Sequence, residues 1–343
     1  MTPAAVNPIC STLVVRTLAG ALTVSAALTA QVGVFAAQVI ASNTNGGAGG
    51  GIFAPTNALG APGGSTDVHS LGIAGDLTLG FSTAIVDGPG ADLIVSENPF
   101  RLSSNPLQTF AEVMFVEVSS DGVHFARFPS RYYGPASQPG PFGTVPIGSY
   151  SGLAGQSPVL TTTAGADPRD VVEAGGDAFD LADLNGDPLV VQSLVDLQSI
   201  VQVRLVDVVS GQSLDSNGSP IFDPGSGSAD VDAVTAIHQL GNVAPNGPSV
   251  TISIATDGTA TLRFEDPDGW QDIDASTLRA AIVGLPIPIS ALLGSMQVQQ
   301  ADALGFTLVQ PVPLPNDLLY TLSFSVKDMA GTRSGATRTR PTS

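Results

Sequence analysis

The residues of this sequence that most clearly suggest a chemical role are Asp and Glu in turn-forming segments, whose carboxylates could bind a cation. Asp87 and Asp92 bracket a Gly-Pro-Gly turn, and Glu97 follows shortly after them. Asp180 and Asp230 stand in two later acidic segments. A hard cation such as Ca²⁺ takes about six to eight oxygen ligands, several of them from carboxylates on bent backbone. This pattern predicts one structural calcium site, formed by Asp87, Asp92, Glu97 and either Asp180 or Asp230.

The same carboxylates have a simpler interpretation, which stays open. An Asp in a turn often accepts hydrogen bonds from its own backbone and binds nothing. None of the acidic segments completes the twelve-residue EF-hand pattern. A further acidic turn, Asp266-Pro267-Asp268-Gly269 with Asp272 and Asp274 behind it, allows the same two interpretations, a weak calcium loop or a solvated turn.

Catalytic patterns are scarce. The three histidines, His69, His124 and His238, do not stand at zinc-ligand spacings, and the sequence has no H-E-x-x-H motif. A G-x-S-x-G nucleophile turn is also missing. A Ser/His/Asp triad assembles only in space, so an extracellular hydrolase stays an alternative. The main expectation is a protein without catalytic activity.

Aromatic residues offer a second kind of candidate site. Tyr132, Tyr133 and Phe142 lie in a segment, residues 131–168, that is rich in Gly, Pro and Ser and has little periodic pattern. Such a segment is typical of a surface loop, and aromatic faces in a loop can stack on the C–H faces of sugars. The alternative is that these rings fill the edge of a core.

Composition limits the classes of partner. Thirty acidic residues against twelve basic ones give a net charge of −18. A surface with this charge repels phosphate backbones, so we expect no nucleic-acid partner. Hydrophobic residues make up 43% of the chain and charged residues 12%, which favours a folded protein over an acidic disordered one.

The N-terminus has the pattern of an export signal. Arg16 precedes an apolar stretch from Leu18 to Ala30, and Val34-Phe35-Ala36 fits the small-x-small pattern of a cleavage site. We therefore predict a signal peptide over residues 1–37 and a mature chain that is secreted or on the cell surface. A retained membrane anchor is the alternative. No other apolar run is long enough to span a membrane, and the single Cys10 would leave with the signal peptide.

The rest of the sequence predicts an all-β protein with two β-sandwich domains. Short apolar runs between turn signals indicate strands. The predicted strands are Leu77–Phe81, Asp92–Ser96, Val113–Ser119, His124–Phe128, Ile200–Val209, Ala233–Gln239, Ser249–Ala255, Thr259–Glu265 and Thr321–Lys327. Val113–Ser119 is apolar on both faces, which predicts a central strand. Ala275–Val283 is the one predicted helix, with Ser276 as its cap. The predicted domains are residues 38–240 and 248–335, with a linker over 241–247 and a flexible tail over 336–343.

Three resemblances refine this picture. Val116 to Phe125, VEVSSDGVHF, resembles the strand–turn–strand of discoidin-like, galactose-binding-like domains, and Tyr320 to Gly331 resembles bacterial Ig-like repeats. Residues 52–240 also resemble a family of bacterial cell-surface proteins, through an ordered series of segments: ALGAP (58–62), SLG (70–72), DGPGADL (87–93), ENPF (97–100), FDLADL (179–184) and DVDAV (230–234). The resemblances imply a jelly-roll, galactose-binding-like sandwich followed by an Ig-like sandwich.

The expected function follows from these features. We expect a non-catalytic, exported recognition or adhesion protein that binds an extracellular glycan or protein through loops braced by calcium. A structural spacer without a specific ligand is the first alternative, and an extracellular hydrolase is the second.

Overall fold

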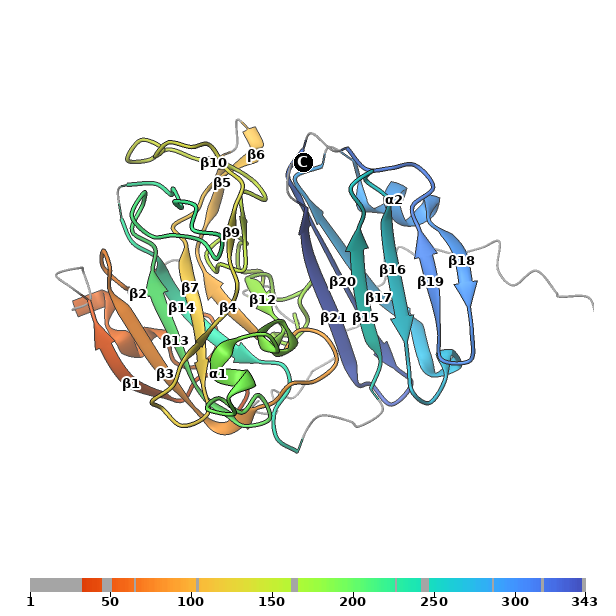
Figure 1. Cartoon of the computed structure of the whole chain (residues 1–343), viewed down its shortest axis with the longest axis horizontal. Coiled ribbons are helices and arrows are strands. Elements are labelled where there is room, and N and C mark those ends of the chain that lie inside the picture. Colours follow the sequence, from red (N-terminus) through yellow and green to blue (C-terminus); the bar gives the residue numbers. More distant parts are fainter. Residues whose placement is uncertain are drawn as a thin grey trace, which may run out of the picture.

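The chain is almost entirely β-structure, as the sequence predicts. The computed structural model describes residues 33–44, 51–64, 66–102, 105–161, 166–225, 227–241, 247–285, 287–315 and 318–340. Its strands form two groups that stand side by side (Figure 1). We call residues 33–241 the N-terminal region and residues 247–340 the C-terminal region. Within the described residues no sheet takes strands from both regions. The predicted linker falls largely on residues 242–246, outside the described ranges.

Two antiparallel sheets form the body of the N-terminal region. One has the order β1 (Gln38–Asn43), β3 (Asp76–Ile85), β13 (Ile200–Asp207), β7 (Met114–Ser119) and β8 (Ala126–Arg127). The other has the order β12 (Asp177–Phe179), β4 (Leu93–Glu97), β14 (Asp230–Ala236) and β2 (His69–Ser70). Smaller sheets are made by β10 (Val145–Pro146), β6 (Asn105–Phe110) and β5 (Phe100–Leu102), and by β11 (Tyr150–Ser151) and β9 (Arg131–Tyr132). The short helices are η1 (Gly51–Phe53), η2 (Pro55–Ala58), η3 (Leu181–Leu184) and α1 (Pro188–Val191).

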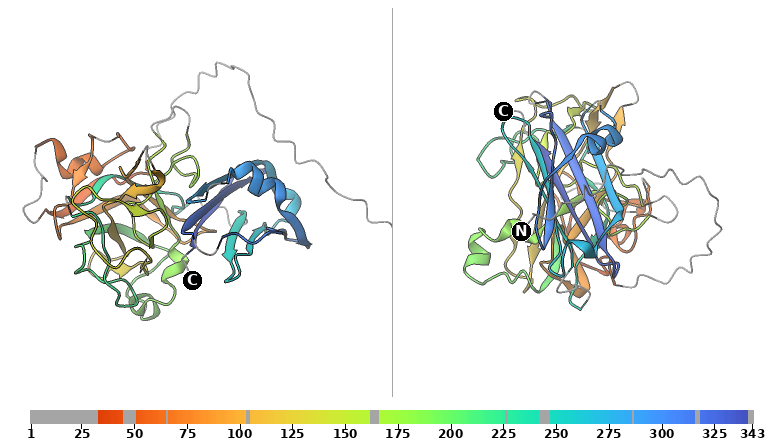
Figure 2. Two further views of the ribbon diagram at one scale, coloured as in Figure 1. Left: turned by 90° about the horizontal axis from the view of Figure 1, so that it is seen from above. Right: turned by 90° about the vertical axis from the view of Figure 1, so that its right-hand side faces the viewer.

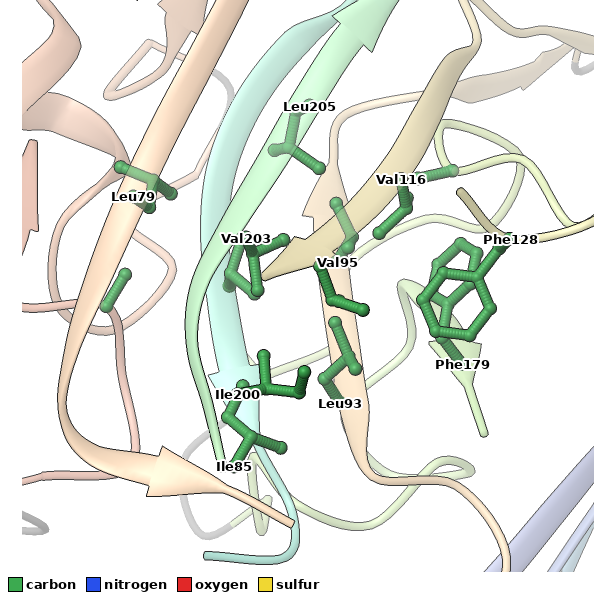
Figure 3. Close-up of a cluster of buried hydrophobic side chains, with 14 of the residues drawn as sticks. Leu79, Ile85, Leu93, Val95, Val116, Phe128, Phe179, Ile200, Val203 and Leu205 are labelled. Atoms are coloured by element: carbon green, nitrogen blue, oxygen red, sulfur yellow. The ribbon is translucent and has the colours of Figure 1, made fainter. Parts of the chain in front are cut away.

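The main core lies between these two sheets. Alternate residues of each strand point inward, because successive side chains of a strand lie on opposite faces. Figure 3 shows the contributions of one sheet, Leu79, Val116, Val203 and Leu205, close to those of the other, Leu93 and Val95. Phe128 and Phe179 close one end, with ring centroids 4.9 Å apart.

Strand β7 is central, as its doubly apolar sequence predicts. All six of its residues are buried, with β13 on one side and the short β8 on the other. The turn after β7 uses Asp121-Gly122: Gly122 has φ 74°, which glycine adopts without strain. Asp121 accepts hydrogen bonds from the amides of Val123 and His124, both at 2.8 Å. Asp121 and Gly122 therefore form the turn between β7 and β8 through their own backbone and side-chain preferences.

The C-terminal region has two antiparallel sheets and its own core. One has the order β15 (Ser249–Ile254), β16 (Ala260–Glu265), β19 (Gly305–Val309) and β18 (Gln297–Ala301), and the other β17 (Ile273–Val283), β20 (Tyr320–Asp328) and β21 (Arg333–Arg340). Its helices are η4 (Trp270–Asp272) and α2 (Ile289–Ser295). Figure 2 shows the two sheets from further directions. The predicted strands Ser249–Ala255 and Thr259–Glu265 are confirmed as β15 and β16, and they form a hairpin around Asp257-Gly258 with Ile254 opposite Ala260.

Two sequence-based predictions for this region are wrong. Ala275–Val283 is not a helix but most of strand β17, which pairs with β20. Leu278, Ala280 and Ile282 alternate along it and pack against the core, so partners from β20 outweigh local helix propensity. The predicted tail also begins too early, because residues 336–340 belong to β21 and pair with β20 as far as Tyr320 opposite Arg340.

Residues 33–37 belong to the fold, although the sequence assigns them to the signal peptide. Ala36 is 2% exposed, and its amide donates to the Val234 carbonyl at 3.0 Å. The Val34 carbonyl accepts from the Ala236 amide at 2.6 Å, and the Ala37 amide donates to Gly80 at 2.9 Å. Residues 1–32, the rest of the predicted signal peptide, lie outside the described residues. Cleavage after Ala36 would remove residues that pack in this fold.

We expect a chain that begins at Ala37 to be less stable than one that begins at Gly33 by about 2–6 kcal/mol, since residues 33–36 take part in four hydrogen bonds and each lost bond costs roughly 0.5–1.5 kcal/mol. Urea unfolding of the two chains measures the difference. Equal midpoints would mean that residues 33–36 contribute nothing to the folded state.

The two regions meet along β21, the C-terminal strand nearest to the N-terminal region (Figure 1). The Ala91 amide donates to the Gly335 carbonyl at 3.0 Å, and the Ser334 hydroxyl donates to the Pro89 carbonyl at 2.8 Å. Arg333 reaches Asp170 at 2.5 Å. The loop between β3 and β4, which carries Asp87 and Asp92, therefore lies at the junction between the regions.

No helix among the described residues is both long enough and apolar enough to cross a membrane.

Candidate cation-binding site

Strand register brings three of the predicted carboxylates together. Strands β4 and β12 pair with Leu93 opposite Phe179. Asp92 and Asp180 are the next residues along, so they come to adjacent places at the same edge of the sheet. Asp87 reaches them through the Gly-Pro-Gly turn. One carboxylate oxygen from each of Asp87, Asp92 and Asp180 lies within 4.8 Å of the others.

Asp92 is the structural centre of this cluster. Its side chain is fully buried. One oxygen accepts from the Gly88 amide at 2.8 Å and shares a 2.7 Å hydrogen bond with Nδ1 of His238, and the other accepts from the Leu181 amide at 2.7 Å. Asp92 thereby connects the β3–β4 loop, the start of η3 and the end of β14. A carboxylate oxygen has two lone pairs, so the oxygen bound to Leu181 can accept one further partner.

Asp87 and Asp180 have more room for a ligand. No described residue donates a hydrogen bond to the Asp87 carboxylate, and the Asp180 side chain caps η3 through one bond from the Ala182 amide at 2.9 Å. Burial, with Asp92 as the next cause, raises the pKa of Asp87 and raises that of Asp180 to about 7. Repulsion between neighbouring carboxylates and their partial burial both disfavour the charged forms. A bound cation would offset this repulsion and stabilise the charged forms.

Glu97 and Asp230 do not join this cluster, contrary to the predicted ligand set. Asp92 precedes β4 and Glu97 ends it, so five residues of extended chain, about 16 Å, separate them. Glu97 and Asp230 instead lie with Glu112 in a second acidic pocket, whose wall includes Phe100. Sequence reasoning did not identify Glu112, because it lies in a loop and its partners come from β4 and β14.

This second pocket holds strongly perturbed acids. Glu97 is 2% exposed, and burial, with Asp230 as the next cause, raises its pKa well above the ordinary value. Burial and then the charge of Asp230 raise the pKa of Glu112 to about 8. A raised acid pKa means that the folded chain keeps a proton that the unfolded chain has already lost.

These protonated acids make the stability of the folded chain depend on pH. Between the ordinary Glu pKa and about 8, the folded state binds more protons than the unfolded state, so the free energy of unfolding falls as pH rises through this window. We expect wild type to be less stable at pH 8 than at pH 5, and Glu112→Gln to show a shallower fall. Urea unfolding at several pH values measures both slopes. An unchanged slope in Glu112→Gln would contradict the assignment.

The aromatic residues do not form one platform. Tyr132 packs against Tyr150 and Phe222, at ring-centroid distances of 5.4 and 6.0 Å, and its hydroxyl donates to the Pro135 carbonyl. Phe142 is 84% exposed. Tyr132 therefore fills the edge of a small core, whereas Phe142 is the aromatic of the segment that faces solvent. Tyr133 donates its amide to the Ser149 carbonyl at 2.8 Å, and it belongs to the same folded part of the segment.

The second predicted acidic turn also forms a cluster. Asp266, Asp268 and Asp272, all in the C-terminal region, bring one oxygen each within 4.8 Å of the others. Asp274 is not part of the group; it accepts hydrogen bonds from the amide and hydroxyl of Ser276.

The comparisons with known proteins add no family. No protein-family model matches the chain, and no curated protein shows significant similarity to it. The resemblances to discoidin-like domains, Ig-like repeats and bacterial cell-surface proteins therefore stay predictions, and the candidate sites have to be judged on their geometry.

Proposed function

We propose that this chain is an exported, non-catalytic recognition or adhesion protein of the bacterial cell exterior, which binds an extracellular glycan or protein and contains structural calcium. The observation that carries the proposal is the convergence of Asp87, Asp92 and Asp180 at the junction of the two regions. A cation there would hold the β3–β4 loop against η3, next to the contacts with β21.

The chemistry of the cluster favours calcium. Its donors are carboxylate oxygens, which hard divalent cations prefer, whereas zinc and copper favour nitrogen and sulfur. Calcium tolerates irregular geometry and completes its shell with water and backbone carbonyls. His238 does not compete as a ligand on this side, because its Nδ1 is bound to Asp92.

A hydrolase is the second candidate, and one observation favours it. The buried His238–Asp92 pair has the form of the His–Asp part of a catalytic triad. The other ring nitrogen, Nε2, is buried and has no hydrogen-bond partner among the described residues. A triad needs a nucleophile within hydrogen-bond reach of that nitrogen, so the pair serves better as a structural link. Hydrolysis of a glycan or peptide pool that is lost in His238→Ala would support the hydrolase instead.

Thermal unfolding with calcium and with chelator tests the proposal. Calcium at a hundred times its Kd stabilises by about 2.7 kcal/mol, which corresponds to a rise in Tm of roughly 5–10 °C for a domain of 150–250 residues. Asp87→Asn and Asp180→Asn should reduce the shift. Asp196→Asn is the matched control, since this exposed carboxylate caps its own loop at the Gln198 amide.

Glycan-array binding with and without chelator then tests recognition. Calcium-dependent binding supports the proposal. A calcium-dependent Tm with no binding to any glycan or protein would favour the structural spacer. If Asp87→Asn and Asp180→Asn leave the calcium-dependent Tm shift unchanged, calcium does not bind at this cluster.

A further inference from the structure

The loop between β16 and η4 brings its carboxylates together by its own conformation. Asp266 follows the last residue of β16, and Asp272 ends η4. Gly269 has φ 111°, a value that favours glycine and lets the chain turn between Asp268 and η4. Two oxygens bound to one calcium ion at 2.3–2.6 Å can be no more than about 5 Å apart. One carboxylate oxygen from each of Asp266, Asp268 and Asp272 lies within 4.8 Å of the others, which meets this condition.

Asp266 distinguishes this loop from a solvated turn. Its side chain is 0% exposed. Oδ1 accepts a hydrogen bond from the Asp268 amide at 2.9 Å, whereas Oδ2 is buried and has no hydrogen-bond partner among the described residues. A buried charged acceptor without a partner keeps its full desolvation penalty, which destabilises the folded state. An Asp that only capped its own turn would leave this oxygen in water.

The surroundings of Asp266 are acidic. Burial is the main cause that raises the pKa of Asp266, and the charges of Asp272, Asp328 and Asp268 add to it. Asp328 ends β20 and is 5% exposed. Its side chain accepts from the Thr332 amide at 2.7 Å. The neighbouring charges that raise the pKa of Asp266 are therefore all those of carboxylates.

We propose that Asp266, Asp268 and Asp272 form a calcium site within the C-terminal region, with the buried Oδ2 of Asp266 as its innermost ligand. The donor set contains only oxygen, which selects a hard cation. Magnesium requires nearly ideal octahedral geometry at about 2.0–2.1 Å, whereas calcium accepts a loop whose ligands come from irregular backbone. The bound ion would join the end of β16 to η4. This site shares no residue with the Asp87 cluster, and it does not depend on the recognition function.

Trp270 gives this site a specific signal. It is the only tryptophan of the chain, and it lies in the loop between Asp268 and Asp272. Terbium(III) occupies calcium sites and emits when a nearby tryptophan is excited. We therefore expect excitation of Trp270 in the chelator-treated full chain to produce saturable terbium emission, which calcium displaces.

Substitutions show which acidic cluster binds the terbium that emits. Asp272→Asn and Asp268→Asn should weaken terbium binding at least about tenfold, because even changes outside the ligand shell of a metal cost 10–100-fold. Asp274→Asn is the matched control, a neighbouring carboxylate outside the cluster. Asp87→Asn should leave the emission unchanged, so failure at one cluster is distinguished from failure at the other. Circular dichroism of each variant shows that it is folded, and the Asp268 and Asp272 variants keep the test independent of the buried Asp266.

Three results would overturn the proposal. The first is the absence of Trp-sensitised emission from folded wild type. The second is emission that Asp268→Asn and Asp272→Asn do not reduce. The third is displacement of terbium by magnesium as effectively as by calcium, which would remove the assignment to calcium.

Discussion

Asp92→Ala is expected to lower the free energy of unfolding by at least about 3 kcal/mol, because three hydrogen-bond donors would lose their acceptor. The Asp92 carboxylate is 0% exposed and accepts bonds from the Gly88 amide, the Leu181 amide and Nδ1 of His238. Alanine would leave these three donors without their acceptor in the interior, and each costs about 1–3 kcal/mol. Urea unfolding in the presence of chelator measures the loss without a contribution from bound metal.

Asp87→Ala is the control for this prediction. Asp87 belongs to the same acidic cluster, yet no described residue donates a hydrogen bond to its carboxylate. Under chelator we expect it to change stability much less than Asp92→Ala. If the two variants unfold at the same urea concentration, Asp92 is not the structural link between the β3–β4 loop, η3 and β14.

Asp170→Ala is the second change with a large expected effect, because Asp170 connects the two regions. Its side chain is buried, and one oxygen accepts from the Ser325 hydroxyl at 2.8 Å and from the Val172 amide at 2.9 Å. The other oxygen lies 2.5 Å from Arg333, whose side chain is 11% exposed. Removing Asp170 would leave the largely buried guanidinium of Arg333 with Asp167, at 3.2 Å, as its one remaining ion-pair partner among the described residues. We expect a loss of about 3–5 kcal/mol.

Calorimetry tests this prediction and also reports on the coupling of the regions. Asp170→Ala should lower Tm, and it should broaden or split the transition if the two regions unfold together in wild type. Arg279→Ala is the control: Arg279 forms a more exposed pair with Glu173, at 3.1 Å, and exposed pairs contribute about 0–1 kcal/mol. A wild-type-like transition in Asp170→Ala would mean that the Asp170–Arg333 contact does not hold the regions together.

Local sequence patterns predicted correctly those elements whose conformation depends on neighbouring residues. The Asp121-Gly122 and Asp257-Gly258 turns formed where their residues predict them, since an Asp-Gly pair meets the backbone demands of a tight turn by itself. The doubly apolar run at Met114–Ser119 became a buried central strand. Ala275–Val283 was mispredicted for the opposite reason: its residues favour a helix locally, and only pairing with β20 makes them part of strand β17.

The candidate sites divide in the same way. The Asp266–Asp272 cluster lies within one loop, so the sequence contains nearly all of it. The Asp87 cluster depends on the pairing of β4 with β12, which places Asp180 beside Asp92 although the two are far apart in sequence. Strand β4 also separates Glu97 from Asp92, because the two residues lie at opposite ends of this extended segment.

The sequence alone determined that this protein is built from strands, where its tight turns lie and that its surface charge is strongly negative, because these properties arise from residue types and short-range spacing. Tertiary structure decided which carboxylates meet, that residues 33–37 pack into the N-terminal region, that residues 336–340 belong to β21, and that the β3–β4 loop packs against β21. These outcomes depend on strand order and register, which bring together residues far apart along the chain, and no local pattern encodes them.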